Sequence, residues 1–280
     1  PLRITFGGGG TDLPSFYNQS DGFLISATID KYIYLSLYEP FKDFFFLKYS
    51  DNEKVKKITN IKHPIIKKVF EKYIPNQKKI ELQVAADLPA GTGMGSSGAF
   101  TAGLIKAIYA FQKRSIGGYE LAEQACDIEI KDLKRNVGKQ DQYSSVYGGI
   151  NSYTFTKNKV VVEPLNITNP TLKKLEDNLC LFFTKFSRSA DQILKKQNVL
   201  TKQKNKEILD NLKFNRELGY KSREYLENGD LDRFSNVLNE QWNCKLNRSP
   251  ETFNSKIISL YNHGLKNGAS GGKLVGAGGG

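Results

Sequence analysis

The sequence has few residues of the kinds that bind structural metals or form disulfide frameworks. It holds three cysteines, Cys126, Cys180 and Cys244, and no two of them form a CxxC pair. This spacing excludes a zinc knuckle and a dithiol redox motif, and it fits a reducing compartment. A run of 18 apolar residues is also absent, as are the basic, apolar and small-residue zones of a signal peptide. We therefore expect a soluble, cytoplasmic protein without a membrane partner.

The chain also lacks internal repeats and long polar tracts of low complexity. Its hydrophobic share is 39%, with 17 Phe and 14 Tyr, a composition typical of folded globular chains. At 280 residues, roughly three quarters of the unfolded surface can be buried, in one large domain or in two ordinary ones.

Acidic residues are fewer than basic ones. The formal net charge is +12, and clustered lysines would favour a nucleic-acid backbone through counterion release. The lysines are scattered, however, over amphipathic segments such as KVKK, IIKKV and LTKQKNKE. We interpret them as a Lys-rich surface with no nucleic-acid partner, and the positive excess fits an anionic small substrate.

β-branched and aromatic residues predict strands in the first half of the chain. We expect strands at residues 2–6, 23–29, 32–37, 44–49 and 79–84, and a hairpin within 152–162. Apolar spacing predicts helices at 63–73, 97–111 and 118–133, and mostly helical structure over 191–246. A further strand at 179–183 follows a linker at 164–170. Because the composition shifts near residue 165, we expect two lobes.

Residues 89–100, PAGTGMGSSGAF, are glycine-rich and lead into an apolar helix. Gly93, Gly95 and Gly98 satisfy GxGxxG, but nine positions separate Gly93 from Val84 of the preceding strand, which disfavours a dinucleotide fold. The P-loop pattern is absent because no lysine lies between Gly91 and Thr101. What remains is a loop that brings two serines to a helix N-terminus, a place suited to phosphate. A serine N-cap among tightly packed small residues is the alternative.

Two carboxylates further along the chain favour the phosphate interpretation. Glu129 falls on the apolar helix face of Ala122, Ala125 and Cys126, where a carboxylate needs a partner such as a metal ion. Asp141 lies in GKQDQYSSVYGG, residues 138–149, among polar and small residues before a Gly-Gly turn. For this second segment an ordinary capped turn is the alternative.

Three segments, in this order, resemble the three motifs of the GHMP small-molecule kinases. They are RITFGGGGTDLP at 3–14, PAGTGMGSS at 89–97 and GGKLVGAGGG at 271–280, and the resemblance spans essentially the whole chain. The GGGGTDLP form, the GKQDQY segment and FSRSAD at 186–191 most resemble the branch that acts on heptose 7-phosphate, with the fucokinase branch as the near alternative.

The resemblance implies a two-lobed α+β GHMP kinase fold. Residues 1–165 would form a mixed-sheet, ATP-binding N-terminal lobe with the phosphate loop, and residues 166–280 a ferredoxin-like C-terminal lobe. It also implies transfer of the γ-phosphoryl group of ATP, with Mg²⁺ as cofactor, to an alcohol group of a small metabolite. The implied nucleotide-binding loop consists of Pro89, Gly91, Gly93, Gly95, Ser96, Ser97 and Gly98.

By the same resemblance, four residues have roles in the reaction. Ser97 and Glu129 would hold Mg²⁺. Asp141 would act as general base toward the accepting hydroxyl. Arg3 would lie near that aspartate and stabilise the transferring phosphoryl group.

On the acceptor side, Thr11 and Asp12 match sugar-hydroxyl contacts, although this segment also suits a turn. Arg188, together with Lys139, would receive the substrate phosphate, and an ion pair of Arg188 with Asp191 is the alternative. The implied product is the 1,7-bisphosphate of D-glycero-D-manno-heptose, for activated heptose in surface polysaccharide. A non-catalytic sugar sensor of the same fold is the alternative from another functional class, and a homodimer is compatible with the resemblance.

Overall fold

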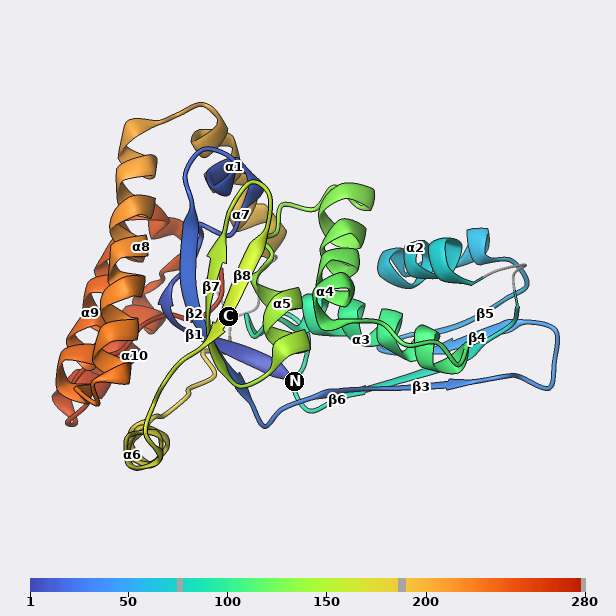
Figure 1. Cartoon of the computed structure of the whole chain (residues 1–280), viewed down its shortest axis with the longest axis horizontal. Coiled ribbons are helices and arrows are strands. Elements are labelled where there is room, and N and C mark those ends of the chain that lie inside the picture. The colour runs from blue at the N-terminus through green and yellow to red at the C-terminus, as the bar shows by residue number, and fades with distance from the viewer. Residues whose placement is uncertain (75–77, 186–189, 278–280) are drawn as a thin grey trace. The chain divides into compact units, whose positions relative to one another are not determined.

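The computed structural model of the chain describes residues 1–74, 78–185 and 190–277 (Figure 1). Its internal contacts divide the chain into two compact units, each assembled from several segments. The first unit comprises residues 1–2, 29–90 and 95–147, and the second comprises 3–28, 91–94 and 148 onward. The contiguous domains 1–165 and 166–280 expected from the sequence are a different division of the chain, and they stay a prediction.

The first unit is built on a mixed sheet with the strand order β3-β6-β4-β5. Its strands are β3 (Ile33–Tyr38), β4 (Phe45–Lys48), β5 (Asn52–Val55) and β6 (Glu81–Ala86). β4 runs parallel to β6, whereas β3 and β6, and β4 and β5, are antiparallel. Burial alternates along β3 and β4, so one face of the sheet carries the core.

The helices of the first unit share one core with this sheet. They are α2 (Pro64–Tyr73), α3 (Ser96–Phe111), α4 (Gly118–Cys126) and α5 (Gln140–Tyr147), with a 3₁₀ turn at Ile58–Asn60 and a π-helix at Asp127–Asp132. Phe45, Phe70 and Leu104 are fully buried in this core. α2 begins where local chemistry favours it, because its first residue is a proline and the His63 ring accepts a hydrogen bond from the Ile66 amide at 3.3 Å.

The second unit is built on a sheet with the strand order β1-β2-β7-β8. Its strands are β1 (Leu2–Gly8), β2 (Gly22–Ile29), β7 (Ile150–Phe155) and β8 (Val160–Pro164). Its helices are α1 (Pro14–Tyr17), α6 (Asn169–Asn178), α7 (Ala190–Lys202), α8 (Lys206–Glu227), α9 (Leu231–Arg248) and α10 (Ser255–Lys266), with a 3₁₀ turn at Pro250–Thr252. Aromatic pairs join sheet to helix: Phe23 stacks on Tyr220 at 4.1 Å between ring centroids, and Phe6 meets Phe234 edge-on at 5.8 Å.

The α+β class with two sheets confirms the fold expected from the sequence, and the strands and helices expected before residue 165 are all present. The strand expected at 179–183 is wrong. These residues belong to neither a helix nor a strand, and Leu181, Phe182 and Phe183 are exposed. Apolar composition alone cannot form a strand, because a strand needs a hydrogen-bonding neighbour.

Helix α5 was not expected as a helix. Its buried side chains include Gln140, Gln142 and Ser144 beside Tyr143, so an apolar period does not mark it. Helices α6 and α10 and strand β5 were also not expected.

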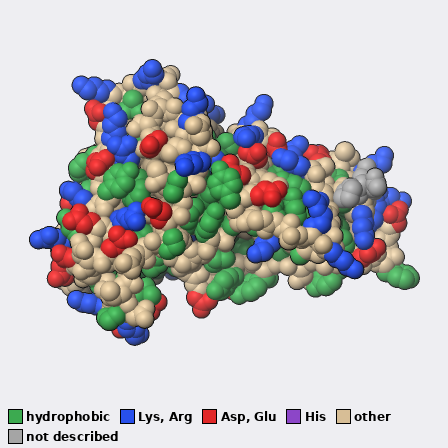
Figure 2. All heavy atoms as spheres, viewed as in Figure 1, with side chains coloured by type: hydrophobic (Ala, Val, Ile, Leu, Met, Phe, Trp, Pro, Cys, Tyr) green, Lys and Arg blue, Asp and Glu red, His purple; other side chains and the backbone are tan. Residues whose placement is uncertain are grey.

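The charged side chains are dispersed on the face of the molecule that Figure 2 shows. Figure 2 shows lysine and arginine side chains spread over the visible face and interspersed with acidic ones, rather than gathered in one patch. The described residues contain no helix that is both long enough and apolar enough to cross a bilayer.

Candidate active site

In the glycine-rich loop, every second residue from 91 to 95 has a backbone conformation that favours glycine. Gly91, Gly93 and Gly95 have φ angles of 82°, 74° and 78°, in the left-handed region. Gly95 is the N-cap residue of α3 and offers no side chain to cap it. The serine N-cap alternative is therefore not realised, and Ser96 and Ser97 are the first helical residues. Uncapped first-turn amides at the positive end of a helix suit an anion such as phosphate.

Ser97 meets the buried carboxylate that the sequence analysis had singled out. Its Oγ donates a hydrogen bond to Oε2 of Glu129 at 2.5 Å, and Thr101 Oγ1 donates to Oε1 at 3.3 Å. Glu129 is 1% exposed and lies within the π-helix that follows α4. A π-helical turn shifts the register of the side chains, and such turns are frequent at functional sites.

Two further side chains, neither of them predicted from the sequence, bind the same carboxylate. Gln142 Nε2 donates to Oε1 of Glu129 at 2.8 Å, and Arg135 Nη1 donates to Oε2 at 3.2 Å. Arg135 also reaches Ser97 Oγ at 2.9 Å. Lys134, at φ 53°, ends the π-helix in the left-handed conformation, and the Arg135 amide then bonds back to the Glu129 carbonyl at 2.9 Å. This turn returns the guanidinium to the carboxylate.

Burial raises the pKa of Glu129, and the charge of the nearby Asp141 acts in the same direction. Hydrogen bonds from Ser97 and Gln142 and the charge of Arg135 oppose this shift but do not cancel it. Glu129 is thus a buried carboxylate that a second cation would stabilise in its charged form.

Asp141 is brought to the start of α3 by close helix contact. A β-carbon on Gly98 would lie 2.5 Å from Cβ of Asp141 and 2.8 Å from the Gln142 amide nitrogen. Only glycine allows this approach of α5 to α3. The predicted residues Ser97, Glu129 and Asp141 therefore meet in one place within the first unit.

Lys139 has a different environment from the one expected. Its Nζ donates to both carboxylate oxygens of Glu123, at 2.7 and 2.9 Å, and the Tyr143 hydroxyl donates to the same carboxylate. The ion pair holds α4 and α5 together, and substrate binding by Lys139 stays a prediction.

The residues of the first motif lie in the second unit. Arg3, on β1, is 6% exposed, and its Nη1 donates to the Gly93 carbonyl at 2.6 Å. Thr11 is fully buried, and its hydroxyl exchanges hydrogen bonds with the backbone of Phe23 at 3.0 and 3.2 Å. Thr11 thus anchors the loop to β2, whether or not it meets a sugar. Asp12 is 8% exposed. Arg188 lies outside the described residues.

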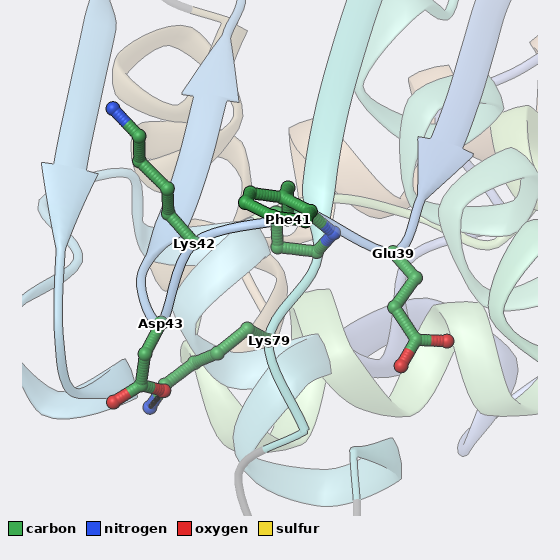
Figure 3. Close-up of a pocket in the computed structure, with 6 residues that line it drawn as sticks. Glu39, Phe41, Lys42, Asp43 and Lys79 are labelled. Carbon is green, nitrogen blue, oxygen red and sulfur yellow. Dashed lines mark ion pairs between the residues drawn. The ribbon is translucent and has the colours of Figure 1, made fainter.

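A pocket of about 270 Å³ lies at the connection between β3 and β4 (Figure 3). Its wall consists of Glu39, Pro40, Phe41, Lys42, Asp43 and Lys79. Phe41 is fully exposed there, and Lys79 pairs with Asp43 at 3.9 Å. None of the residues expected from the sequence lines this pocket, so we assign it no chemistry.

The donors present suit part of a Mg²⁺ site. Among the residues that the structure describes, no group of three His, Cys, Asp or Glu could hold a metal by itself. Mg²⁺ usually takes one or two carboxylates, keeps several waters and gains its other ligands from substrate phosphates. The carboxylate of Glu129 and the hydroxyl of Ser97, beside a helix N-terminus suited to phosphate, fit this donor set.

Comparison with known proteins agrees with the geometry. The family profile of the GHMP kinases N terminal domain matches residues 58–149. The chain is 32% identical to the D-glycero-alpha-D-manno-heptose 7-phosphate kinase of Campylobacter jejuni, over 100% of this chain and 86% of that protein. It is 27% identical to the bifunctional fucokinase/GDP-fucose pyrophosphorylase of Arabidopsis thaliana, over 72% of this chain and 19% of that protein.

A solved structure shows the same fold. The D-glycero-D-manno-heptose 1-phosphate kinase of B. thetaiotaomicron superposes with a TM-score of 0.80 at 25% identity, over 99% of this chain and 84% of that one. The sequence similarity over the whole of this chain, the family profile and the fold support the same family. The chain belongs to the GHMP kinases, a family of phosphotransferases.

Proposed function

We propose that this protein is a sugar kinase that transfers the γ-phosphoryl group of ATP to the anomeric hydroxyl of D-glycero-D-manno-heptose 7-phosphate. The product would be the 1,7-bisphosphate, for nucleotide-activated heptose in surface polysaccharide synthesis. One observation carries the proposal: Ser97, Glu129 and Asp141 meet at the uncapped N-terminus of α3. The similarity to the C. jejuni heptose 7-phosphate kinase, over all of this chain and 86% of that protein, supports the choice of acceptor.

The nucleotide phosphates would lie on the glycine-rich loop. The loop runs from Pro89 to Gly98 and ends at the first turn of α3, whose N-cap residue, Gly95, has no side chain to bind the first amides. Ser97 and Glu129 would hold Mg²⁺, which supplies charge neutralisation on the phosphate oxygens. Arg135 forms an ion pair with Glu129 at 3.2 Å in this structure. When Mg²⁺ binds Glu129, the guanidinium of Arg135 would move to make room for it.

Asp141 would take the proton from the accepting hydroxyl. Phosphoryl transfer depends chiefly on positioning and charge stabilisation, and a carboxylate that orients the acceptor fits that demand. The close packing of α5 on α3 at Gly98 fixes the position of this carboxylate. Arg3, bound to the Gly93 carbonyl of the loop, would stabilise the transferring group.

Thr11 and Asp12 would contact sugar hydroxyls. The sequence also assigned the substrate phosphate to Lys139 and Arg188. Lys139 is engaged in its ion pair with Glu123, and Arg188 lies outside the described residues, so the structure offers no support for either assignment.

Two alternative functions predict different results in an ATP-consumption assay. A fucokinase-like sugar 1-kinase is supported by the similarity to the Arabidopsis protein. A sugar sensor of the same fold would bind a sugar without consuming ATP. Such a protein would not need Ser97, Glu129 and Asp141 together at one site.

The test is an ATP-consumption assay over D-glycero-D-manno-heptose 7-phosphate, the dephosphorylated heptose, fucose and galactose. We expect rapid ADP release with the heptose 7-phosphate and much slower release with the free sugars. Turnover of fucose without turnover of heptose 7-phosphate would support the fucokinase alternative. A protein that binds sugars but consumes no ATP with any acceptor would be a sensor.

A further inference from the structure

Four cationic side chains gather in the second unit from segments far apart in the sequence. Arg3 lies on β1, Lys245 and Arg248 lie in the last turn of α9, and Lys273 lies in the glycine-rich segment after α10. Lys245, Arg248 and Lys273 have no role in the proposed phosphoryl transfer. Their arrangement therefore needs its own explanation.

Backbone contacts show how closely the segments approach. Lys245 Nζ donates to the carbonyls of Leu274 at 3.3 Å and Gly276 at 2.5 Å. A β-carbon on Gly276 would lie 2.5 Å from the Gly93 carbonyl oxygen, the same oxygen that accepts the hydrogen bond from Arg3. The end of α9, the segment around Gly276 and the Arg3 guanidinium thus converge on the backbone of Gly93.

The remaining contacts of the three unassigned cations are neutral. Lys273 Nζ donates to the amide oxygen of Gln241 at 2.6 Å, and Arg248 Nη1 donates to that of Asn211 at 2.9 Å. Arg248 Nε is buried and has no partner among the described residues. Within the described chain, none of these three cations forms an ion pair with a carboxylate, and each keeps donors for a further acceptor.

Positive charges so placed repel one another. Burial lowers the pKa of Lys273 to about 7, and the charges of Arg3 and Arg248 add to that effect. Burial and the same cationic neighbours hold the pKa of Lys245 well below its usual range. Lys245, Arg248 and Lys273 are each only partly exposed. Like charges held together away from water are costly, and an anion bound among them relieves that cost.

We propose that Lys245, Arg248 and Lys273 form a binding site for the phosphate group of the acceptor sugar. The inference rests on the proposed function and assigns its substrate phosphate to side chains that the sequence did not single out. A phosphomonoester carries up to two negative charges and three acceptor oxygens, which match one guanidinium and two ammonium groups.

The position of Asp12 favours the acceptor over ATP as the source of that phosphate. A β-carbon on Gly10 would lie 3.2 Å from Leu212 of α8, and Arg248 binds the neighbouring Asn211. The loop that carries Asp12 and the Arg248 guanidinium thus contact the same part of α8, and the charge of Asp12 acts on Arg248. Asp12 belongs to the motif expected to contact sugar hydroxyls. A phosphate bound at Arg248 and a hydroxyl bound at Asp12 can therefore belong to one sugar phosphate.

The first test is steady-state kinetics of Lys273→Gln and Arg248→Gln. We expect the KM for heptose 7-phosphate to rise about tenfold or more, because a charge-assisted hydrogen bond is lost. The KM for ATP and the rate with the dephosphorylated heptose should change less than about twofold. Lys266→Gln, at an exposed lysine of α10, is the matched control and should leave all constants unchanged.

Two kinetic outcomes overturn the proposal. A rise in the KM for ATP with an unchanged acceptor KM would assign the cations to the nucleotide. Equal effects on the phosphorylated and dephosphorylated acceptors would remove them from phosphate recognition.

A second measurement uses the wild-type protein and needs neither turnover nor a folded variant. An amine-reactive reagent at pH 7.5, followed by peptide mass spectrometry, reports the reactivity of Lys273. We expect heptose 7-phosphate to protect Lys273, whereas the dephosphorylated heptose and ATP do not. Protection by ATP alone, or equal labelling with and without the sugar phosphate, would overturn the site even if the kinase activity holds. Protection in a protein that does not phosphorylate heptose 7-phosphate would support the site and reject only the proposed reaction.

Discussion

Ser97 and Glu129, 32 positions apart in the chain, are joined by a hydrogen bond of 2.5 Å between Oγ and Oε2. The bond connects the first turn of α3, where phosphate is expected, with a carboxylate that is 1% exposed. Neither residue needs the other for helix formation. Their contact places a hydroxyl and a carboxylate side by side at a helix N-terminus, a pair of oxygen ligands that suits Mg²⁺.

Ser97→Ala removes the hydroxyl from this pair. We expect a higher Mg²⁺ concentration for half-maximal activity and a kcat lower by about tenfold to a hundredfold, the cost typical of disturbed metal sites. Ser235→Ala, which removes a hydroxyl that bonds to the Asp232 carbonyl within α9, is the control. Titration of activity with MgCl₂ checks the prediction, and identical Mg²⁺ curves for Ser97→Ala and the wild type would contradict it.

Asp141→Asn keeps the shape of the side chain and removes its charge. We expect kcat to fall by about 10² to 10⁴ while the thermal unfolding midpoint changes little, because general bases contribute on that scale. Asp127→Asn, which removes a surface partner of Lys131, is the matched control and should retain near-normal turnover. A near-normal rate for Asp141→Asn would exclude it as the base.

Gly98→Ala tests the packing that positions Asp141. Within a helix, alanine is normally more stable than glycine by up to about 1 kcal/mol. Here the new methyl group would lie 2.5 Å from Asp141 Cβ and 2.8 Å from a backbone nitrogen, so we expect a loss of about 1–3 kcal/mol in unfolding free energy and a lower kcat. Gly103→Ala, in the same helix, meets only the end of the Leu35 side chain. Urea unfolding should show a smaller loss for Gly103→Ala, and equal losses would contradict the steric explanation.

Glu129→Gln tests the electrostatics of the buried carboxylate through pH. Since the folded state raises the pKa of Glu129, the stability that this group contributes is present below its unfolded pKa, near about 4.3, and is lost as pH rises through the folded value. Glu129→Gln has no titrating carboxyl at this position, so its unfolding free energy lacks this pH-dependent loss. Its stability relative to the wild type should therefore increase with pH above about 4.3, by at most about 1.4 kcal/mol per pH unit.

Urea unfolding of Glu129→Gln and wild type from pH 4 to 7 measures this difference. Glu120→Gln, at an exposed position of α4, is the control for an ordinary carboxylate. A relative stability of Glu129→Gln that falls with rising pH would mean that Arg135 and the hydrogen bonds outweigh burial.

Lys139→Met separates the ion pair from substrate binding. The variant leaves the carboxylate of Glu123 with the Tyr143 hydroxyl but without its cation, and we expect a loss of about 1–3 kcal/mol in unfolding free energy. The KM for heptose 7-phosphate should stay within about twofold. A tenfold rise in that KM with unchanged stability would restore Lys139 to the phosphate site.

The glycine-rich loop, Ser97, Glu129 and Asp141 can be predicted from the sequence because each departs from the local residue pattern. Glycines precede an apolar helix, a carboxylate lies on an apolar face, and an acid stands in a small-residue segment. No sequence pattern distinguishes Arg135 from the other Lys and Arg residues, of which the chain has 41 in all. Its contact depends on the left-handed turn at Lys134, which no local propensity predicts.

The other differences have similar physical causes. Helix α5 buries Ser144 and Gln142, which donates to Glu129, in place of apolar side chains, so hydrophobic periodicity does not detect it. The cluster of Lys245, Arg248 and Lys273 depends on the approach of α9 to the segment around Gly276. Such approaches are set by tertiary packing and cannot be found in the spacing of residues along the chain.

The most direct test of the proposed reaction is the identity of its product. The protein is incubated with ATP, MgCl₂ and D-glycero-D-manno-heptose 7-phosphate, and the mixture is followed by ³¹P nuclear magnetic resonance. We predict a new phosphomonoester signal coupled to the anomeric proton, growing in step with ADP while the 7-phosphate signal persists. ADP release without a phosphate at the anomeric carbon, or no reaction with this acceptor while fucose is phosphorylated, would contradict the proposal.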